Sequence, residues 1–222
     1  SCVGIERKPA VLCHCSKVYA AYEQRENMAK EGVKYKMIAI GGSAGSLNVM
    51  LDIISSLPPN TGASFVVIVH RKNSGDSILT DLIAAKTQMD VKEVEDKEPI
   101  VENTVYLAPS DYHLLTENEH SFSLDSSEKV HYSRPSIDVT FESIAEIFRE
   151  GSIGILLSGA NADGAEGLAK IRQFGGLAIV QNPASAEVSY MPEQAIQKNA
   201  ADKILKPEEI VTLIVEMLSV KS

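Results

Sequence analysis

Three polar residues follow short apolar runs and together carry the side chains of a serine hydrolase. Ser43 lies in a glycine-rich turn of sequence GGSAG. His70 directly follows the apolar run 65–69, and Asp163 comes shortly after the run 153–157. A hydroxyl, an imidazole and a carboxylate serve as nucleophile, general base and orienting group in acyl transfer. We therefore interpret Ser43, His70 and Asp163 as a candidate catalytic triad.

The turn around Ser43 fits two functions. It matches G-x-S-x-G, which places a nucleophilic serine between a strand and a helix. Glycines and free amides at a helix start can instead hold a phosphate. The turn completes neither the dinucleotide motif G-x-G-x-x-G nor a P-loop, which weakens the nucleotide alternative. Two hypotheses remain: an esterase, and a non-catalytic nucleotide-binding or signalling scaffold.

His70 and Asp163 also have simpler structural explanations. A lone histidine at a strand end is more often a surface or capping residue, and an aspartate before a helix is often its N-cap. Like Ser43, however, both are expected at the carboxyl ends of parallel strands, where open α/β sheets bind ligands. Three such positions together favour catalysis. The other histidines have no apolar strand directly before them: His14, His113, His120 and His131.

Short apolar runs alternate with helical periods from Lys36 onward, which indicates an α/β fold with a doubly wound sheet. Runs that predict buried parallel strands are found at 37–40, 65–69, 104–107, 153–157 and 177–180. Helical periodicity is found at 47–57, 77–85, 139–148, 165–174, 193–199 and 210–218.

Two regions depart from this alternation. The stretch 91–131 contains β-like pieces separated by polar residues, at 91–94, 112–116 and 121–124. It predicts an antiparallel β-hairpin excursion from the mainly parallel sheet. Residues 1–35 show only a weak helical stripe. We expect them to form an N-terminal appendage to a catalytic domain over 36–222.

The composition limits the compartment and the partners. The chain has 30 acidic and 21 basic side chains, a net charge of −9, and no basic cluster, so nucleic acid is not an expected partner. Its apolar runs fall short of the ~20 residues that span a membrane, and no signal peptide is evident. All three cysteines precede residue 16, which argues against a disulfide framework and a paired zinc site. We expect a cytoplasmic protein without membrane insertion.

Longer motifs accompany the three candidate residues. They are Ile40 to Gly45, Val66 to His70, Tyr106 to Pro109, Ser133 to Val139, Leu157 to Ala165, Gln181 to Pro183 with Glu187, and Met191-Pro192. In this order they resemble the catalytic domain of chemotaxis protein-glutamate methylesterases, the CheB family, from about Lys36 to the C-terminus. The resemblance implies a Rossmann-like sheet and hydrolysis of glutamate γ-methyl esters on cytoplasmic receptor helices. It implies that methanol is released, and members of the family often deamidate glutamine as well.

The resemblance also implies residue roles. It makes Ser43 the nucleophile, His70 the base and Asp163 the carboxylate, without a metal or organic cofactor. Backbone amides near Ala44 and Ala160 are expected to hold the oxyanion, although the family usually has Thr and Met there. Backbone donation does not depend on those side chains.

Arg134 is a further candidate, either for a substrate carboxylate or as a loop anchor. An ion pair with Asp138 is the simpler alternative for this arginine. Because the chain is acidic, a carboxylate-rich receptor helix would be repelled at long range, and local contacts must overcome that repulsion.

The family's regulatory form has an N-terminal receiver domain of about 100 residues or more, a usual domain size. The 35 residues before the catalytic domain are too few for one. We therefore expect a stand-alone esterase or a subunit that serves another system, and an esterase with a different substrate is an alternative that the sequence leaves open.

Overall fold

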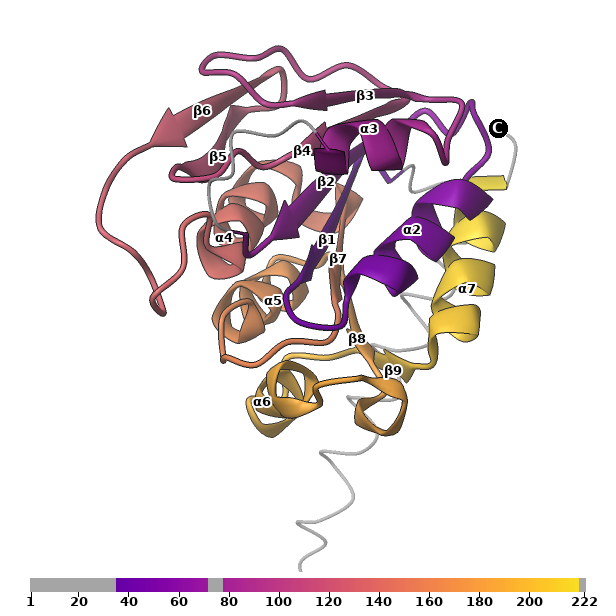
Figure 1. Cartoon of the computed structure of the whole chain (residues 1–222), viewed down its shortest axis with the longest axis vertical. Coiled ribbons are helices and arrows are strands. Elements are labelled where there is room, and N and C mark those ends of the chain that lie inside the picture. The colour runs from indigo at the N-terminus through magenta and orange to yellow at the C-terminus, as the bar shows by residue number, and fades with distance from the viewer. Residues whose placement is uncertain (1–34, 72–77, 220–222) are drawn as a thin grey trace, which may run out of the picture. The chain divides into compact units, whose positions relative to one another are not determined.

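A seven-stranded sheet runs through the structure, a computed structural model that describes residues 35–71 and 78–219 (Figure 1). Its strands are β1 (Met37–Gly42), β2 (Ser64–Val69), β3 (Asp90–Glu93), β4 (Thr104–Leu107), β7 (Ser152–Leu156), β8 (Leu177–Gln181) and β9 (Lys203–Leu205). Their spatial order is β3-β4-β2-β1-β7-β8-β9, and every pairing is parallel. Strand order reverses at β1, which confirms the predicted doubly wound α/β fold.

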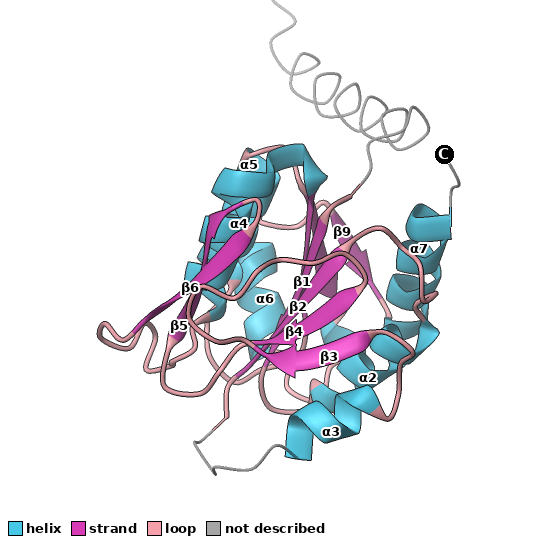
Figure 2. Ribbon diagram, turned by 90° about the horizontal axis from the view of Figure 1, so that it is seen from above, coloured by secondary structure: helices cyan, strands magenta, loops and turns pink. Residues whose placement is uncertain are grey.

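Helices cover both faces of this sheet (Figures 1 and 2). One face carries α2 (Leu47–Ser56), α3 (Ile78–Ala84) and α7 (Pro207–Ser219), and the other carries α4 (Ile137–Phe148), α5 (Ala165–Gln173) and α6 (Tyr190–Gln197). Short 3₁₀ turns occupy Arg149–Gly151 and Pro183–Ser185.

Successive side chains of each strand point to opposite faces of the sheet, so the hydrophobic core has two parts. In β1, Met37 and Ala39 pack with the α4 side, whereas Ile38 and Ile40 pack with the α2 side. Side chains in a strand point to opposite faces in turn, so a sheet covered on both sides has strands that are apolar throughout. This explains why the strands appeared in the sequence as continuous apolar runs.

The predicted excursion is partly confirmed and partly wrong. Strands β5 (His113–Asn118) and β6 (Ser121–Asp125) form the expected antiparallel hairpin, and β5 packs on α4. The piece at 91–94 is instead β3, which pairs in parallel with β4 at the edge of the main sheet. Its polar composition suits an edge, where one side faces solvent. Strand β9 was not predicted, because three residues are too few to show a period.

The predicted helices are all present, and the start of α4 matters most for the site. It begins at Ile137 after the N-cap Ser136, whose hydroxyl accepts a hydrogen bond from the Val139 amide at 3.4 Å. The predicted appendage, with its cysteines and His14, falls almost entirely outside the described residues. Within the described part of the chain, no helix is long and apolar enough to cross a membrane.

Candidate active site

Three loops meet at the carboxyl edge of the central strands. Ser43 follows β1, His70 follows β2, and Asp163 lies in the loop between β7 and α5. Because β1 lies between β2 and β7, these loops are neighbours, although 93 positions separate His70 from Asp163. The sheet therefore brings the three predicted residues to the edge where its strand order reverses, the usual place of a ligand crevice.

The backbone around Ser43 is tightly packed. A β-carbon on Gly41 would lie 2.5 Å from Cγ2 of Ile137 in α4, and Gly45 has a left-handed φ of 76°. Both positions therefore require glycine. The buried Ser46 hydroxyl donates to the Ser43 carbonyl oxygen at 2.6 Å. Ser43 itself is half-buried, and its hydroxyl has no hydrogen-bond partner among the described residues.

The His70 imidazole is held by the buried Asp163. Nε2 of His70 lies 2.7 Å from Oδ2 of Asp163. Donors at the start of α4 reach the same carboxylate: the Ser136 hydroxyl at 2.7 Å, the Ile137 amide at 2.8 Å and the Asp138 amide at 3.0 Å. Asp163 is thus the partner of the histidine and also an anion at a helix N-terminus, where the helix dipole favours negative charge.

These hydrogen bonds keep the Asp163 carboxyl ionised. Burial alone would raise its pKa, but the bonds from His70 and the start of α4 outweigh burial and lower the pKa below its ordinary value. The simpler explanation for Asp163, an N-cap of the following helix, is wrong. The N-cap of α5 is Gly164, which makes no side-chain cap, and the carboxylate binds the start of α4 instead.

The partners of His70 assign its tautomer. An ionised carboxylate only accepts hydrogen bonds, so Nε2 carries the proton and Nδ1 is the basic nitrogen. Within the described ranges, Ser43 makes no hydrogen bond to Nδ1, and the hydroxyl at that nitrogen is Ser133, at 3.4 Å. Bonds between nucleophile and base in hydrolases often tighten only in the complex with substrate.

The predicted oxyanion donors have unused amides. Neither the Ala44 nor the Ala160 N–H group donates to any residue in the described part of the chain, and both residues are exposed. The Ser43 amide, by contrast, donates to the Ser158 carbonyl oxygen at 2.9 Å. Unpaired backbone amides beside a nucleophile are what an oxyanion hole requires.

Arg134 lies in the loop before α4 and anchors it. Its Nη1 donates to the carbonyl oxygens of residues 126 and 127 at 2.6 and 2.7 Å. The predicted alternative, an ion pair with Asp138, is not formed. The Asp138 carboxylate instead accepts from the Gly167 amide at 2.7 Å and lies 3.4 Å from Nε2 of His131.

The sequence did not single out Ser158, which joins three segments of the site. Its hydroxyl donates to the Ala44 carbonyl oxygen at 2.7 Å and accepts from the Val188 amide at 2.9 Å. Its own amide donates to Oε1 of the buried Gln181 at 3.0 Å. Both Ser158 and Gln181 lie within the motifs that resemble the CheB family, but a motif does not reveal which partner a side chain chooses.

A second buried carboxyl lies beside Asp163. Burial raises the pKa of Asp138 to about 6; the negative Asp163 and Glu166 add to this effect, and the Gly167 amide and His131 oppose it. Oδ2 of Asp138 is buried without a hydrogen bond. This carboxyl is therefore more easily protonated in the folded protein than in the unfolded chain.

Asp138 should make stability fall as pH rises. A raised pKa means that its contribution to stability is complete below about pH 4 and is lost as pH rises through about 6. Asp138→Asn keeps an oxygen for the Gly167 amide and cannot ionise. We compare the free energy of unfolding of the variant with that of the wild type. This difference should change in favour of the variant by up to about 2–3 kcal/mol as pH rises from 4 to 7.5. Urea unfolding at both pH values measures this difference.

The exposed Glu146 on the same helix provides the control for this experiment. Glu146→Gln should leave the difference from wild type nearly constant with pH. If the Asp138→Asn difference were equally constant, burial would not be raising the pKa of Asp138.

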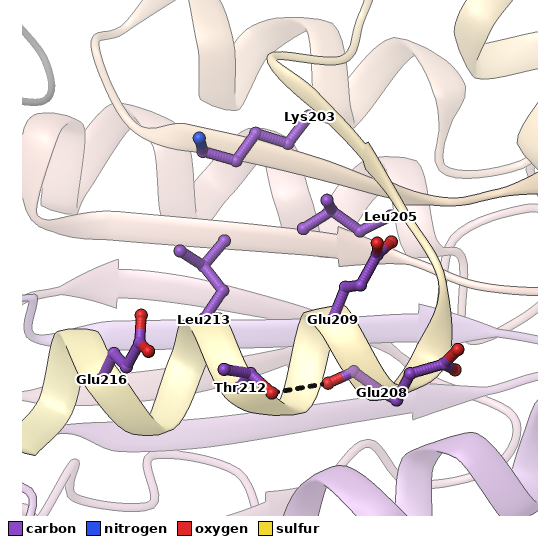
Figure 3. A pocket seen from close by; sticks show the side chains of 7 residues that line it. All are labelled: Lys203, Leu205, Glu208, Glu209, Thr212, Leu213 and Glu216. Carbon is purple, nitrogen blue, oxygen red and sulfur yellow. Dashed lines mark hydrogen bonds between the residues drawn. The ribbon is translucent and has the colours of Figure 1, made fainter.

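The pocket drawn in Figure 3 lies elsewhere, between β9 and α7. Its volume is about 370 Å³, and it is lined by Lys203, Leu205, Glu208, Glu209, Thr212, Leu213 and Glu216. None of the predicted site residues lines it. Across residues 35–71 and 78–219, no group of three or more His, Cys, Asp or Glu side chains is arranged to hold a metal ion.

Comparison with known proteins identifies related chains. The family model described as CheB methylesterase matches residues 38–214. A protein of Leptospira interrogans named putative protein-glutamate methylesterase/protein-glutamine glutaminase is 41% identical over 83% of this chain and 96% of its own length. A Thermotoga maritima protein, named protein-glutamate methylesterase/protein-glutamine glutaminase, is 32% identical over 87% of this chain and 57% of its own length.

A solved structure agrees with these relatives. The crystal structure of the Thermotoga maritima CheB methylesterase catalytic domain superposes with a TM-score of 0.78 at 32% identity. The match covers 82% of this chain and 98% of the crystallised one. The comparisons favour the esterase hypothesis over the nucleotide-binding scaffold.

Proposed function

This chain belongs to the CheB methylesterase family, and we propose that it hydrolyses γ-methyl esters of glutamate in a protein substrate through Ser43, His70 and Asp163. The observation that carries the proposal is the His70–Asp163 pair, 2.7 Å apart, at the sheet edge where Ser43 follows the neighbouring strand. The names of the relatives support the reaction and add the hydrolysis of glutamine amides.

Acylation begins when Oγ of Ser43 attacks the ester carbonyl carbon and its proton passes to Nδ1 of His70. Asp163 keeps its hydrogen bond to Nε2 and stabilises the imidazolium ion by its negative charge. The carbonyl oxygen becomes an oxyanion, which accepts hydrogen bonds from the amides of Ala44 and Ala160. Neither amide has to break another hydrogen bond before it binds the oxyanion, because neither donates to any residue in the described chain.

Loss of methanol completes acylation, and deacylation by water then returns each group to its starting state. The tetrahedral intermediate collapses, the bond to the methoxy oxygen breaks, and Nδ1 of His70 gives its proton to this oxygen, so that methanol leaves. A water molecule then attacks the acyl-Ser43 ester while Nδ1 takes one of its protons. Collapse returns the proton held by His70 to Ser43 and releases the glutamate carboxyl group, which ionises by losing its remaining proton to solvent. Glutamine follows the same course with ammonia as the leaving group.

The substrate class we propose is the methylated helices of chemoreceptor-type signalling proteins, with the reaction taking place in the cytoplasm. The family and the names of its members support this class. Esterification removes the charge of the target glutamate, which lowers its repulsion by a chain of net charge −9.

Release of labelled methanol tests this substrate. Membranes that carry the organism's own receptors, methylated with a labelled methyl group, should release methanol when the wild-type protein is added. The Ser43→Ala protein provides the inactive control. An N-acyl glutamate γ-methyl ester provides a small substrate with the same scissile bond. If the small ester were hydrolysed while the receptors kept their label, the protein would be an esterase with a different substrate.

A further inference from the structure

The hydroxyl of Ser133 lies beside the proposed catalytic base. Oγ of Ser133, in the loop before α4, is 3.4 Å from Nδ1 of His70. Because Nε2 is committed to Asp163, Nδ1 is the nitrogen that must receive and release the proton. Ser133 therefore touches the one atom of His70 whose hydrogen bonding changes during the reaction.

Asn161 connects this hydroxyl to the loop of Asp163. Its Nδ2 donates to Oγ of Ser133 at 3.1 Å, and its Oδ1 accepts from the Asp163 amide at 3.3 Å. Nδ2 also lies 3.4 Å from the carbonyl oxygen of His131. The Asn161 amide is thus held at both ends, which fixes the direction from which it approaches Ser133.

The hydroxyl of Ser133 can satisfy both protonation states of His70. It has one proton and two acceptors at 3.4 Å, Nδ1 of His70 and the carbonyl oxygen of His131. When the imidazole is neutral and no substrate is bound, Oγ–H donates to the single lone pair of Nδ1, and it turns away to the His131 carbonyl oxygen when Ser43 passes its proton to Nδ1. When Nδ1 is protonated, Oγ turns its proton to His131 and accepts from Nδ1, while Asn161 occupies its other lone pair. Only a hydroxyl rotation separates the two arrangements.

We propose that Ser133 and Asn161 are a positioning pair for His70, holding the imidazole with Nδ1 toward the substrate and accepting a hydrogen bond that the imidazolium N–H shares between Ser133 and the leaving oxygen. This inference rests on the proposed function of His70 as the base. The Asp163 contact by itself would leave the ring the freedom to rotate about Nε2. A second contact at Nδ1 removes that freedom and lowers the cost of orienting the base in the transition state.

Kinetics on the small methyl ester test the pair. Ser133→Ala should lower kcat about 10-fold and leave KM unchanged, because the contact serves the transition state and not substrate binding. Ser133→Thr, which keeps the hydroxyl, should recover most of the loss. Asn161→Ala should act in the same direction as Ser133→Ala. The double variant should be no worse than Ser133→Ala, since residues acting as a unit are not additive.

Spectroscopy separates positioning from a structural role. In ¹⁵N-labelled protein, Ser133→Ala should shift the Nδ1 resonance of His70. The proton on Nε2, which is hydrogen-bonded to Asp163, should remain. The matched control is Ser127→Ala, an exposed serine in the same loop, which should change neither kcat nor the spectrum.

Several results would overturn the inference. One is an unchanged kcat in Ser133→Ala. Another is a kcat loss with an unaltered Nδ1 resonance. A loss as deep as that of Ser43→Ala would also overturn it, because Ser133 would then take part in bond formation. Failure of the proposed function is recognised separately, as absence of ester hydrolysis by the wild-type protein, and the Nδ1 resonance still reports the Ser133 contact in that case.

Discussion

Ser43→Ala should abolish hydrolysis of methyl esters and leave the fold intact. We expect kcat to fall by about 10⁴- to 10⁶-fold, because the variant lacks the hydroxyl that we propose forms the acyl-enzyme. The Ser43 hydroxyl makes no hydrogen bond to the described residues, so the free energy of unfolding should change by less than about 0.5 kcal/mol. Methanol release and urea unfolding of the same preparation measure the two quantities.

Ser46 provides the matched control in the same turn. Its hydroxyl is buried and bonded to the Ser43 carbonyl oxygen at 2.6 Å, so Ser46→Ala should cost about 1 kcal/mol of stability. Its activity should fall by less than about 10-fold, since the nucleophile remains. The two serines thus predict opposite patterns. If Ser43→Ala kept a tenth of the wild-type kcat, Ser43 would not be the nucleophile, and Ser133 would be tested in its place.

Asp163→Ala should lose activity and stability together. Without the carboxylate, His70 loses the partner that fixes its tautomer, and kcat should fall by about 10⁴-fold. The same change leaves the Ser136 hydroxyl and the amides of Ile137 and Asp138 without their acceptor at the start of α4. Buried donors without partners should destabilise the protein by about 3–5 kcal/mol. Methanol release and urea unfolding test both effects.

The pH dependence gives this prediction a sign. The pKa of Asp163 is lowered in the folded protein, so its contribution to stability is present above the ordinary Asp pKa of about 4 and is lost as pH falls. The difference in stability between the wild type and Asp163→Ala should therefore shrink in acid. A difference that did not change with pH would show that the charge of Asp163 does not stabilise α4.

His70→Gln is the control for the double role of Asp163. It removes the base, so kcat should fall about as far as in Asp163→Ala. It leaves the three donors at the start of α4 bonded to the carboxylate, so most of the stability should remain. If both variants lost the same stability, the stabilising contribution of Asp163 would come from its hydrogen bond to His70 and not from its bonds to the start of α4.

Local patterns predicted the elements of the fold well where an element has enough residues to show a period. The apolar runs before Ser43 and His70 are β1 and β2, and the turn at Ser43 leads directly into α2. A strand buried on both faces requires apolar residues at each position, and a sharp turn requires glycine. Neighbouring residues are therefore enough to predict both features.

The same patterns failed where the partner of a strand decides its role. The segment 90–93 is short and polar, and its own sequence does not distinguish a parallel edge strand from one arm of a hairpin. Strand β9 is recognised only through its pairing with β8. Pairing between strands depends on residues that are far away in the sequence, so such assignments require the folded sheet.

For the site, the sequence by itself determined which side chains would stand at the carboxyl ends of the central strands: Ser43, His70 and Asp163. Only the tertiary structure decided what each one bonds to. It directs the Asp163 carboxylate to the start of α4, presents Nδ1 of His70 as the basic nitrogen, and brings Ser133, itself bonded to Asn161, to that nitrogen. The physical reason is that helix and strand propensities act between near neighbours, whereas buried polar groups choose their hydrogen-bond partners only after packing has excluded water.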